Sequence, residues 1–408
     1  MDEKTLSKKT LAYALKNAIA YEGKAQQGAV ISSLFHEGLK KEDVKKNLKE
    51  ISKTVNKVNL MSVEEQKKEF EKLKSKISER TSREGLPELP GAKKGKVVMR
   101  IGPAPSGPMH VGNAIIGVMN YLYVKKYGGI FYVRIEDTNP ENIYKPAYNL
   151  IKKDSEWLFE GKAKIVIQSE RMSLYYKYAE ELIRKKSAYV CVCSSEKFKK
   201  FADFKEDCPC RNNDVKENIY RWKNMIHKEG YKEGGAVLRF KTQEEFDGMK
   251  HKNPAMRDFP LARINETSHP LQKKKYRVWP LMNLSVTVDD IELKMTHIIR
   301  GKDHKDNAER QKMIYKVLGK KYPWSAFIGR YKFKDLELSK TKIKEGIESG
   351  KYSCWDDPQL PTISSLKKRK YKPEAFFKFA EQKGLSEADR TFEKKEFFRL
   401  LDSFNTRV

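Results

Sequence analysis

The chain has 408 residues and a formal net charge of +29, from 84 Lys and Arg against 55 Asp and Glu. Its length allows two or three domains, and the basic excess favours a polyanionic partner such as nucleic acid, because Lys and Arg that neutralise phosphates release condensed counterions. The first residues, MDEK, lack the apolar core of a signal peptide, and the longest apolar stretch, residues 114–124, is too short to cross a bilayer. We therefore expect a cytoplasmic protein with no membrane partner.

The first ninety residues are rich in Lys and Glu and almost free of proline. Apolar side chains recur at helical spacing, as at Leu11, Leu15 and Ala18, which predicts three or four helices. Residues 85–91, GLPELPG, have the composition of a linker. We therefore place an N-terminal helical appendage at residues 1–90.

The pattern changes after this segment. Residues 96–101, KVVMRI, indicate a buried strand, and a Gly/Pro-rich turn leads into a helix from about residue 111 to 127. A second strand follows at 130–135. This strand-helix-strand order opens a doubly wound, Rossmann-like α/β domain with a parallel sheet. Later strands are predicted at 165–167 and 296–300.

The block from 188 to 285 interrupts this α/β pattern. It holds four of the five cysteines and an extended stretch at 236–240. We predict that it is inserted between two halves of the catalytic fold. The predicted domains are therefore 1–90, 91–187, 188–285, 286–345 and, for a helical C-terminal region, 346–408.

The turn after the first strand reads RIGPAPSGPMHVGN from Arg100 to Asn113. A glycine such as Gly112 lets a nucleotide lie against the backbone, and a helix N-terminus favours phosphate. His110 is placed to hydrogen-bond phosphate oxygens as charge develops on them. A proline-rich connecting turn without function is the alternative explanation.

Two charged positions follow strands of the predicted sheet. Glu136 comes directly after the second strand, where a carboxylate faces the ligand crevice and can hold an ammonium group. Arg300 ends the strand at 296–300, and its guanidinium fork suits a carboxylate. Taken alone, the charged run after Arg300 is more typical of a solvated loop.

The segment ELSKTK from Glu337 to Lys342 is a weak signal by itself. A mobile loop with Lys340 and the hydroxyls of Ser339 and Thr341 can clamp a triphosphate and stabilise departing pyrophosphate. An ordinary surface loop has the same composition, so the assignment depends on the other motifs.

Cys191 and Cys193 are separated from Cys208 and Cys210 by residues 194–207. Four thiolates suit a closed, tetrahedral structural Zn²⁺ site, and a cytosolic setting favours metal over disulfides. The Cys-x-Cys spacing is tighter than the common Cys-x-x-Cys, so reduced, partly buried cysteines stay open as the alternative.

These motifs together resemble the class I aminoacyl-tRNA synthetases of the glutamate and glutamine branch. The PMHVGN segment resembles their "HIGH" region in its archaeal glutamyl form, and LSKTK resembles their "KMSKS" loop. Further similarity lies in QSER at 168–171 and WDDPQLPT at 355–362, so the resemblance extends from about residue 10 to the end. Glu337 departs from the loop pattern, because it replaces the first lysine.

The resemblance implies ATP-dependent ligation of L-glutamate to tRNA(Glu), with Mg²⁺ accompanying ATP, and leaves open whether tRNA(Gln) is also charged. It implies that the block 188–285 binds the tRNA acceptor stem. It places the catalytic site at His110, Gly112, Asn113, Ser339, Lys340 and Thr341, the ATP site at Pro103, His110, Gly112, Asn113 and Lys340, and the glutamate site at Arg100, Glu136 and Arg300.

Family members continue beyond the length of this chain as β-barrels that read the anticodon. The resemblance therefore leaves three explanations open: the barrels are on a separate anticodon-binding chain that acts as a partner, the sequence is a fragment, or the protein works without them. Bacterial members carry a tyrosine at the place of Met282, and methionine has no hydroxyl to donate the corresponding hydrogen bond. Whether glutamine is rejected as strictly as in those members therefore stays open. Three alternatives remain at this stage: glutamylation of a modified tRNA base, glutaminyl-tRNA synthetase, and a non-catalytic tRNA-binding paralogue.

Overall fold

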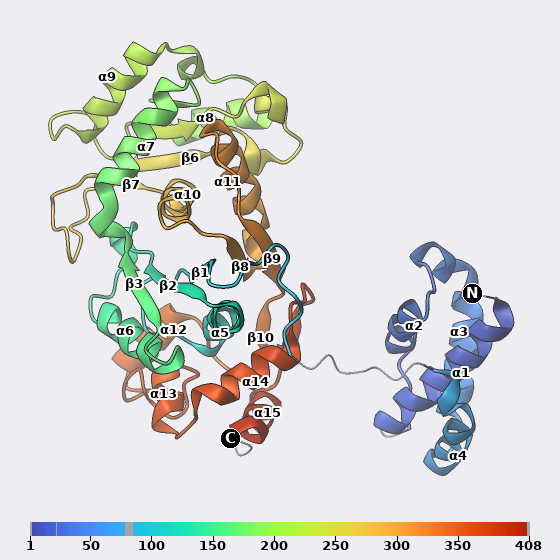
Figure 1. Cartoon of the computed structure of the whole chain (residues 1–408). Coiled ribbons are helices and arrows are strands. Elements are labelled where there is room, and N and C mark those ends of the chain that lie inside the picture. Colours follow the sequence, from blue (N-terminus) through green and yellow to red (C-terminus); the bar gives the residue numbers. More distant parts are fainter. Residues whose placement is uncertain (1, 22, 78–84, 406–408) are drawn as a thin grey trace. The chain divides into compact units, whose positions relative to one another are not determined.

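The structure is a computed structural model of the chain, described here for residues 2–21, 23–77 and 85–405. Contacts divide the chain into two compact units, Met1–Ser82 and Arg83–Val408 (Figure 1). Among the described helices, none is both long enough and apolar enough to cross a membrane.

The first unit is a small helical bundle. Leu15, Val30, Leu34 and Val55 lie in its core. The buried Gln66 ties two of its loops together, because its amide donates to the carbonyls of Gly23 and Val58 and to that of Met61. Its helices are α1 (Glu3–Ala20), α2 (Gln27–His36), α3 (Val44–Asn59) and α4 (Val63–Leu73).

The predicted linker at 85–91 belongs by its contacts to the second unit. Leu89 is buried in the large core of that unit, and its N–H donates to the Tyr127 hydroxyl at 3.1 Å. The carbonyl of Pro90 lies 3.0 Å from Nε2 of His297. The composition signalled a break in helical pattern correctly, but Leu86 and Leu89 supply apolar surface that packs rather than staying in solvent.

A parallel sheet carries the second unit. Strands β1 (Val97–Ile101), β2 (Gly129–Ile135) and β3 (Ala163–Ile167) pair in parallel, as do β8 (His297–Gly301) and β9 (Trp324–Ile328). The Thr296 N–H donates to the Val98 carbonyl at 3.0 Å, so β8 follows β1 on the side away from β2. Strands β2 and β3 are added on one side of β1, and β8 and β9 on the other, so the strand order reverses between β1 and β8. Ligands bind at such a switch point.

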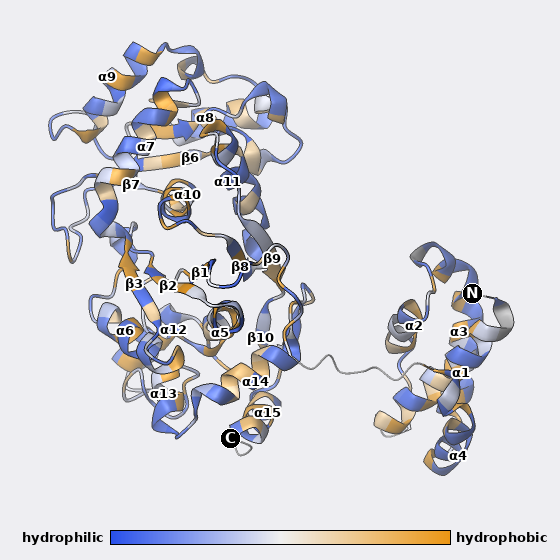
Figure 2. Cartoon of the chain, in the orientation of Figure 1, coloured by the Kyte–Doolittle hydropathy of each residue, from blue (hydrophilic) through white to orange (hydrophobic). Residues whose placement is uncertain are grey.

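Helices cover this sheet and join its strands. Figure 2 shows hydrophobic residues concentrated in β2, β3 and α14, in keeping with the shared core of sheet and helices. The predicted strand-helix-strand opening is confirmed, with the helix beginning and ending at the expected residues. The helices of the two halves are α5 (Val111–Tyr127), α6 (Ala147–Leu158), α7 (Met172–Arg184), α10 (Met282–Glu292) and α11 (Lys305–Val317).

The residues between α7 and α10 form an antiparallel sheet in the order β4-β5-β6-β7. Trp222, Phe240, Leu261 and Trp279 are buried in its core. Its elements are β4 (Ala188–Cys191), α8 (Ser195–Phe204), α9 (Val215–Ile226), β5 (Val237–Phe240), β6 (Pro260–Ile264) and β7 (Val278–Pro280).

The sequence predicted a helical C-terminal region, but this part of the chain also contains a short strand. Two three-residue strands, β10 (Tyr331–Phe333) and β11 (Arg390–Phe392), pair in parallel. The helices here are α12 (Lys340–Glu348), α13 (Ile363–Lys368), α14 (Pro373–Lys383) and α15 (Lys394–Asn405). Short 3-10 turns elsewhere span Lys41–Asp43, Lys74–Lys76, Pro140–Asn142, Gln168–Arg171, Pro209–Asn212, Glu244–Phe246, Gly248–Lys250, Pro254–Met256 and Lys302–His304.

Candidate active site

The start of α5 is built around His110. The His110 Nδ1 accepts a hydrogen bond from the Gly112 N–H at 3.1 Å, and the Asn113 Oδ1 accepts one from the His110 N–H at 2.9 Å. The two bonds form a reciprocal cap. A Cβ at Gly112 would lie 3.1 Å from the His110 ring. A glycine here therefore lets the imidazole fold over the helix N-terminus, where phosphate is favoured.

His110 is a neutral hydrogen-bond donor in this setting. Burial, and then the charge of Lys340, lower the pKa of His110 to about 4. Because Nδ1 accepts from Gly112, the single ring proton of the neutral form lies on Nε2. The imidazole can therefore donate to a phosphate oxygen without carrying a charge of its own.

An extended segment from the C-terminal part braces this turn. The Val111 N–H donates to the Pro361 carbonyl at 3.0 Å, and the Ile363 N–H donates to the Met109 carbonyl at 2.9 Å. The Oδ2 atom of Asp154, on α6, accepts a hydrogen bond from the Met109 N–H at 3.0 Å. The position of His110 is therefore set by three separate parts of the chain.

Lys340 lies at the first position of α12, beside the same turn. Its Nζ donates to the carbonyls of Ala104 at 3.1 Å and Gly107 at 3.2 Å. Ser339 caps the helix by accepting from the Lys342 N–H at 3.4 Å, whereas the Thr341 side chain is exposed. The structure thus brings Lys340 to the His110 turn, although the two are far apart in sequence.

A pH profile tests the environment of Lys340. Burial lowers the pKa of Lys340 to about 8, against an opposing effect of Asp154. The ammonium is charged below that pH and loses its proton above it, so kcat/KM for ATP is expected to fall as pH rises through about 8. Lys340→Arg keeps its charge at higher pH, so its profile should stay level there. An alkaline fall of equal position in both proteins would contradict this.

Glu136, just beyond β2, is held by Arg134. Its Oε1 accepts from Arg134 Nη2 at 2.8 Å and Nε at 3.2 Å. A Cβ at Gly102 would lie 2.1 Å from the same oxygen, so any other residue there would displace the Glu136 carboxylate. Gly102 therefore allows the carboxylate to lie directly against the end of β1.

The three arginines of the sheet have different partners. Arg100 makes two parallel bonds to Asp290, from Nε at 3.0 Å and from Nη2 at 2.8 Å. Arg134 also reaches Asp290, at 2.6 Å. Burial opposes the ionisation of Asp290, but Arg100 and Arg134 outweigh it and lower the pKa of Asp290 to about 2. Arg300 instead donates to two neutral groups, Gln311 at 3.0 Å and the Tyr322 hydroxyl at 2.9 Å.

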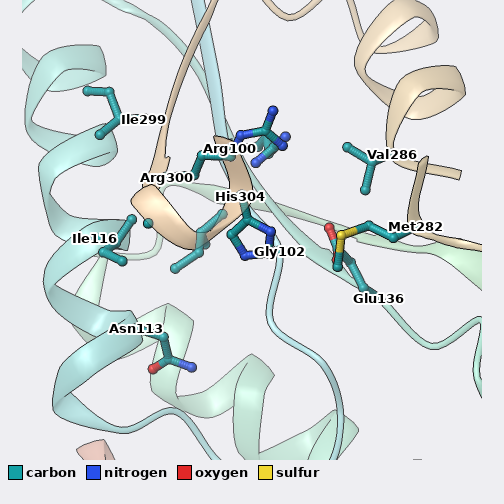
Figure 3. Close-up of a pocket in the computed structure, with 12 residues that line it drawn as sticks. Arg100, Gly102, Asn113, Ile116, Glu136, Met282, Val286, Ile299, Arg300 and His304 are labelled. Atoms are coloured by element: carbon teal, nitrogen blue, oxygen red, sulfur yellow. The ribbon is translucent and has the colours of Figure 1, made fainter. Parts of the chain in front are cut away.

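One cavity gathers the predicted glutamate-binding residues. Arg100, Glu136, Arg300 and Asn113 all line it, with His304 among them (Figure 3). His110, Pro103 and Lys340 lie outside its lining, toward the adjoining turn. The geometry thus offers a cationic and an anionic group for a small zwitterion, next to a helix N-terminus for phosphate.

Comparison with known proteins decides the family. Residues 96–404 match the family described as tRNA synthetases class I (E and Q), catalytic domain. The chain belongs to this family of class I tRNA synthetases. The synthetase is 42% identical over 400 residues to a glutamate–tRNA ligase of Pyrococcus furiosus, covering 95% of this chain and 68% of the relative.

Other relatives and solved structures agree. A glutamate–tRNA ligase of Methanocaldococcus jannaschii is 41% identical over 396 residues, covering 97% of this chain and 70% of the relative. A crystal structure of a glutamate tRNA ligase from Elizabethkingia meningosepticum has 18% identity and a TM-score of 0.54 over 76% of this chain and 69% of that chain. At that identity the structural likeness supports the class I synthetase fold alone, and it confirms the predicted fold class.

Sequence reasoning missed several residues that line this synthetase's cavity or, as with Asp290, bind the arginines of the site. Asp290 and Gly102 carried no motif signal beyond a bare acidic pair and a glycine two residues after Arg100. His304 stood in the charged run after Arg300 but received no role; its Nδ1 lies 3.2 Å from the Asn307 amide nitrogen. Burial lowers the pKa of His304. Met282 also lines the cavity, near Glu136 (Figure 3).

The four paired cysteines of the synthetase come together as predicted. Cys191 ends β4, and Cys208 and Cys210 lie at the start of a 3-10 turn. The sulfur of Cys208 is 3.5 Å from that of Cys191 and 3.4 Å from that of Cys193, and Cys193 is 4.0 Å from Cys210. All four sulfurs lie within 4.8 Å of one another.

Proposed function

We propose that this synthetase is a glutamate–tRNA ligase, which activates L-glutamate with ATP and transfers it to tRNA(Glu). The observation that carries the proposal is a cavity in which Arg300, a buried guanidinium without an internal carboxylate partner among the described residues, faces Glu136. Such a pair fits an amino acid that has an ammonium at one end and a carboxylate at the other. The glutamate–tRNA ligases that resemble the chain along most of its length support the same substrate.

In the first step the α-carboxylate of glutamate attacks the α-phosphate of ATP. A bond from carboxylate oxygen to phosphorus forms, the bond to the bridging oxygen breaks, and pyrophosphate leaves with its electron pair. Mg²⁺ enters with ATP as part of the substrate. Glu136 binds the α-ammonium and Arg300 the side-chain carboxylate, and positioning accounts for much of the rate.

His110 and Lys340 stabilise the phosphates. The Nε2–H of His110 donates to a phosphate oxygen as charge develops there. Lys340 exchanges its two carbonyl acceptors, on Ala104 and Gly107, for triphosphate oxygens. Gly112 and Asn113 shape the helix N-terminus on which ATP lies, and Ser339 fixes the start of α12. Pro103 and Thr341 complete the proposed ATP site by the family pattern.

In the second step a hydroxyl of the terminal adenosine of tRNA attacks the acyl carbon, and AMP leaves. No side chain becomes covalently attached. The net charge of +29 supports a polyanionic partner such as tRNA. Charging of tRNA(Glu) and tRNA(Gln) transcripts with glutamate, compared side by side, tests the tRNA specificity. Charging with and without an added anticodon-binding segment tests whether a separate chain is needed.

We further propose that Cys191, Cys193, Cys208 and Cys210 hold a structural Zn²⁺ ion. Sulfurs at the corners of a tetrahedron lie about 3.8 Å apart when each is about 2.3 Å from zinc. Three of the six sulfur separations are 3.4 to 4.0 Å, close to that spacing, and all six are within 4.8 Å. With all four positions filled by thiolates, the ion would fix the loop between β4 and α9 and take no part in the reaction.

Removal of one cysteine tests the zinc site. Cys208→Ser should lower bound zinc well below one per chain and destabilise the protein by about 3 kcal/mol or more, because metal binding is coupled to folding. Metal content and thermal unfolding are the readouts. Cys354→Ser is the matched control, because Cys354 is exposed and lies outside the cluster. Equal zinc content in both variants, or none in the unaltered protein, would refute the site.

Exchange of labelled pyrophosphate into ATP tests the proposed activation step. We expect exchange that depends on glutamate when the assay is run with tRNA present. Glutamine in place of glutamate should give little exchange. Absence of exchange with every amino acid would favour a non-catalytic tRNA-binding protein instead.

A further inference from the structure

Arg300 is held in an unusual way for a buried arginine. Its side chain is 6% exposed, and its Nη2 donates to Gln311 Oε1 at 3.0 Å and to the Tyr322 hydroxyl at 2.9 Å. Its Nε has no hydrogen-bond partner. Both acceptors are neutral, and among the described residues no carboxylate forms an ion pair with Arg300. Asp290 and Glu136 therefore act on this guanidinium only from beyond ion-pair distance.

The neighbouring arginines show the contrast. Arg100 and Arg134 both pair with the buried carboxylate of Asp290, at 2.8 Å and 2.6 Å. Their charges are neutralised inside the protein. Of these three arginines, Arg100 and Arg134 form ion pairs with Asp290. Arg300, near the end of β8, instead donates its hydrogen bonds to the neutral side chains of Gln311 and Tyr322.

Gln311 is placed so that its neutrality matters. It lies on α11, is 0% exposed, and offers only its carbonyl oxygen to Arg300. Its own Nε2 has no partner. A glutamate at this position would keep the shape and the acceptor, and would lose no existing hydrogen bond of the amide nitrogen. It would differ from glutamine chiefly by one buried negative charge beside Arg300.

Tyr322 completes the support from the other side. Its ring packs edge-on against Tyr315, with the ring centres 5.1 Å apart. This packing fixes the hydroxyl oxygen as a second acceptor for the same Nη2 atom of Arg300. The two contacts on Nη2 direct the remaining edge of the guanidinium into the cavity that Glu136 also lines.

We propose that Gln311 and Tyr322 are positioning residues that hold Arg300 through neutral acceptors, so that its charge stays available for the side-chain carboxylate of the substrate. Selectivity for glutamate over glutamine then depends on what stands behind Arg300, as well as on Arg300 itself. The inference rests on the proposed function, because it assigns the carboxylate that Arg300 binds.

Gln311→Glu is the decisive variant. The new carboxylate should pair with Arg300 and repel the substrate carboxylate, so KM for glutamate should rise by about 30-fold or more, as expected when a buried charge pair is disrupted. KM for ATP should stay within about twofold of the original, since ATP makes no use of Arg300 in this account. The ratio of kcat/KM for glutamate to that for glutamine should fall, and the unfolding temperature should be unchanged or higher.

Two controls separate charge from shape. Lys316→Gln changes the net charge by the same amount at an exposed position of the same helix, where the lysine pairs with Glu245, and its KM for glutamate should not change. Gln311→Met keeps the site neutral while losing one acceptor, so its effect should be several times smaller than that of Gln311→Glu. Equal effects of Gln311→Glu and Gln311→Met would show a packing role and overturn the inference.

The remaining outcomes are also decisive. If the unaltered protein activates glutamate and Gln311→Glu has the same KM for it, the inference is wrong and the proposed function stands. If the unaltered protein activates no amino acid, the proposed function fails first. Should Gln311→Glu not fold, Tyr322→Phe decides the question: KM for glutamate is expected to rise about threefold or more with KM for ATP unchanged, and an unchanged KM for glutamate would refute the positioning role.

Discussion

Replacing either His110 or Lys340 by alanine is expected to lower the rate of glutamyl-adenylate formation by about 100-fold or more, the usual loss when one charge-stabilising donor is removed. The two side chains meet at one turn, although they come from α5 and α12. His110 offers a neutral Nε2–H, and Lys340 offers an ammonium now bound to two carbonyls of that turn. The readout is glutamate-dependent pyrophosphate exchange with tRNA present.

Loss of the helix cap must be separated from loss of catalysis in His110→Ala. The His110 ring accepts from the Gly112 N–H, and loss of such a cap costs about 1 kcal/mol of stability. Thermal unfolding measures that part, which is too small to unfold the protein. Lys342→Ala is the control for Lys340→Ala, because Lys342 is exposed and reaches only Glu337. Unchanged exchange rates in both His110→Ala and Lys340→Ala would overturn these assignments.

Arg300→Gln is expected to reduce kcat/KM for glutamate by about 30-fold to 1,000-fold or more, because the substrate carboxylate would lose the guanidinium that we propose binds it. The loss should appear in KM for glutamate, with KM for ATP nearly unchanged. Arg300→Lys keeps the charge but lacks the planar fork, so we expect an intermediate value.

Arg184→Gln on the exposed face of α7 is the matched control, since it removes the same group outside the cavity. The contradicting result is a kcat/KM for glutamate in Arg300→Gln within about threefold of that of the control, because a 2 kcal/mol contact removed from a binding site is expected to cost about 30-fold. In that case Arg100, through the part of its guanidinium not bonded to Asp290, would be the reader of the side-chain carboxylate.

The local elements around the site could be predicted because their signals are local. The apolar run before Arg100 forms β1, the glycine pair at 128–129 follows α5, and β2 leads directly to Glu136. The class I fold and the neighbourhood of His110 and Gly112 followed from these. The two cysteine pairs also meet as expected, because the short segment between them, which holds α8, returns the chain to the end of β4.

The contacts that define the charge of the site could not be predicted. The resemblance places Arg100 in the glutamate site, but it does not indicate that most of the guanidinium fork is bonded to Asp290, 190 residues away in the sequence. No periodicity or motif connects such residues, because tertiary packing alone decides their pairing. The contacts of Gln311 and Tyr322 with Arg300 could not be predicted for the same reason. The parallel pair of β10 and β11 was missed because three residues are too few for a strand pattern to emerge.

Charging of purified tRNA with labelled glutamate, beside labelled glutamine, tests the central claim most directly. We predict that the synthetase attaches glutamate to tRNA(Glu) in the presence of ATP and Mg²⁺ and that glutamine is not attached. In Lys340→Ala the initial rate of glutamate charging should be lower by about 100-fold or more. Attachment of glutamine in preference to glutamate, or glutamate charging that survives Lys340→Ala undiminished, would contradict it.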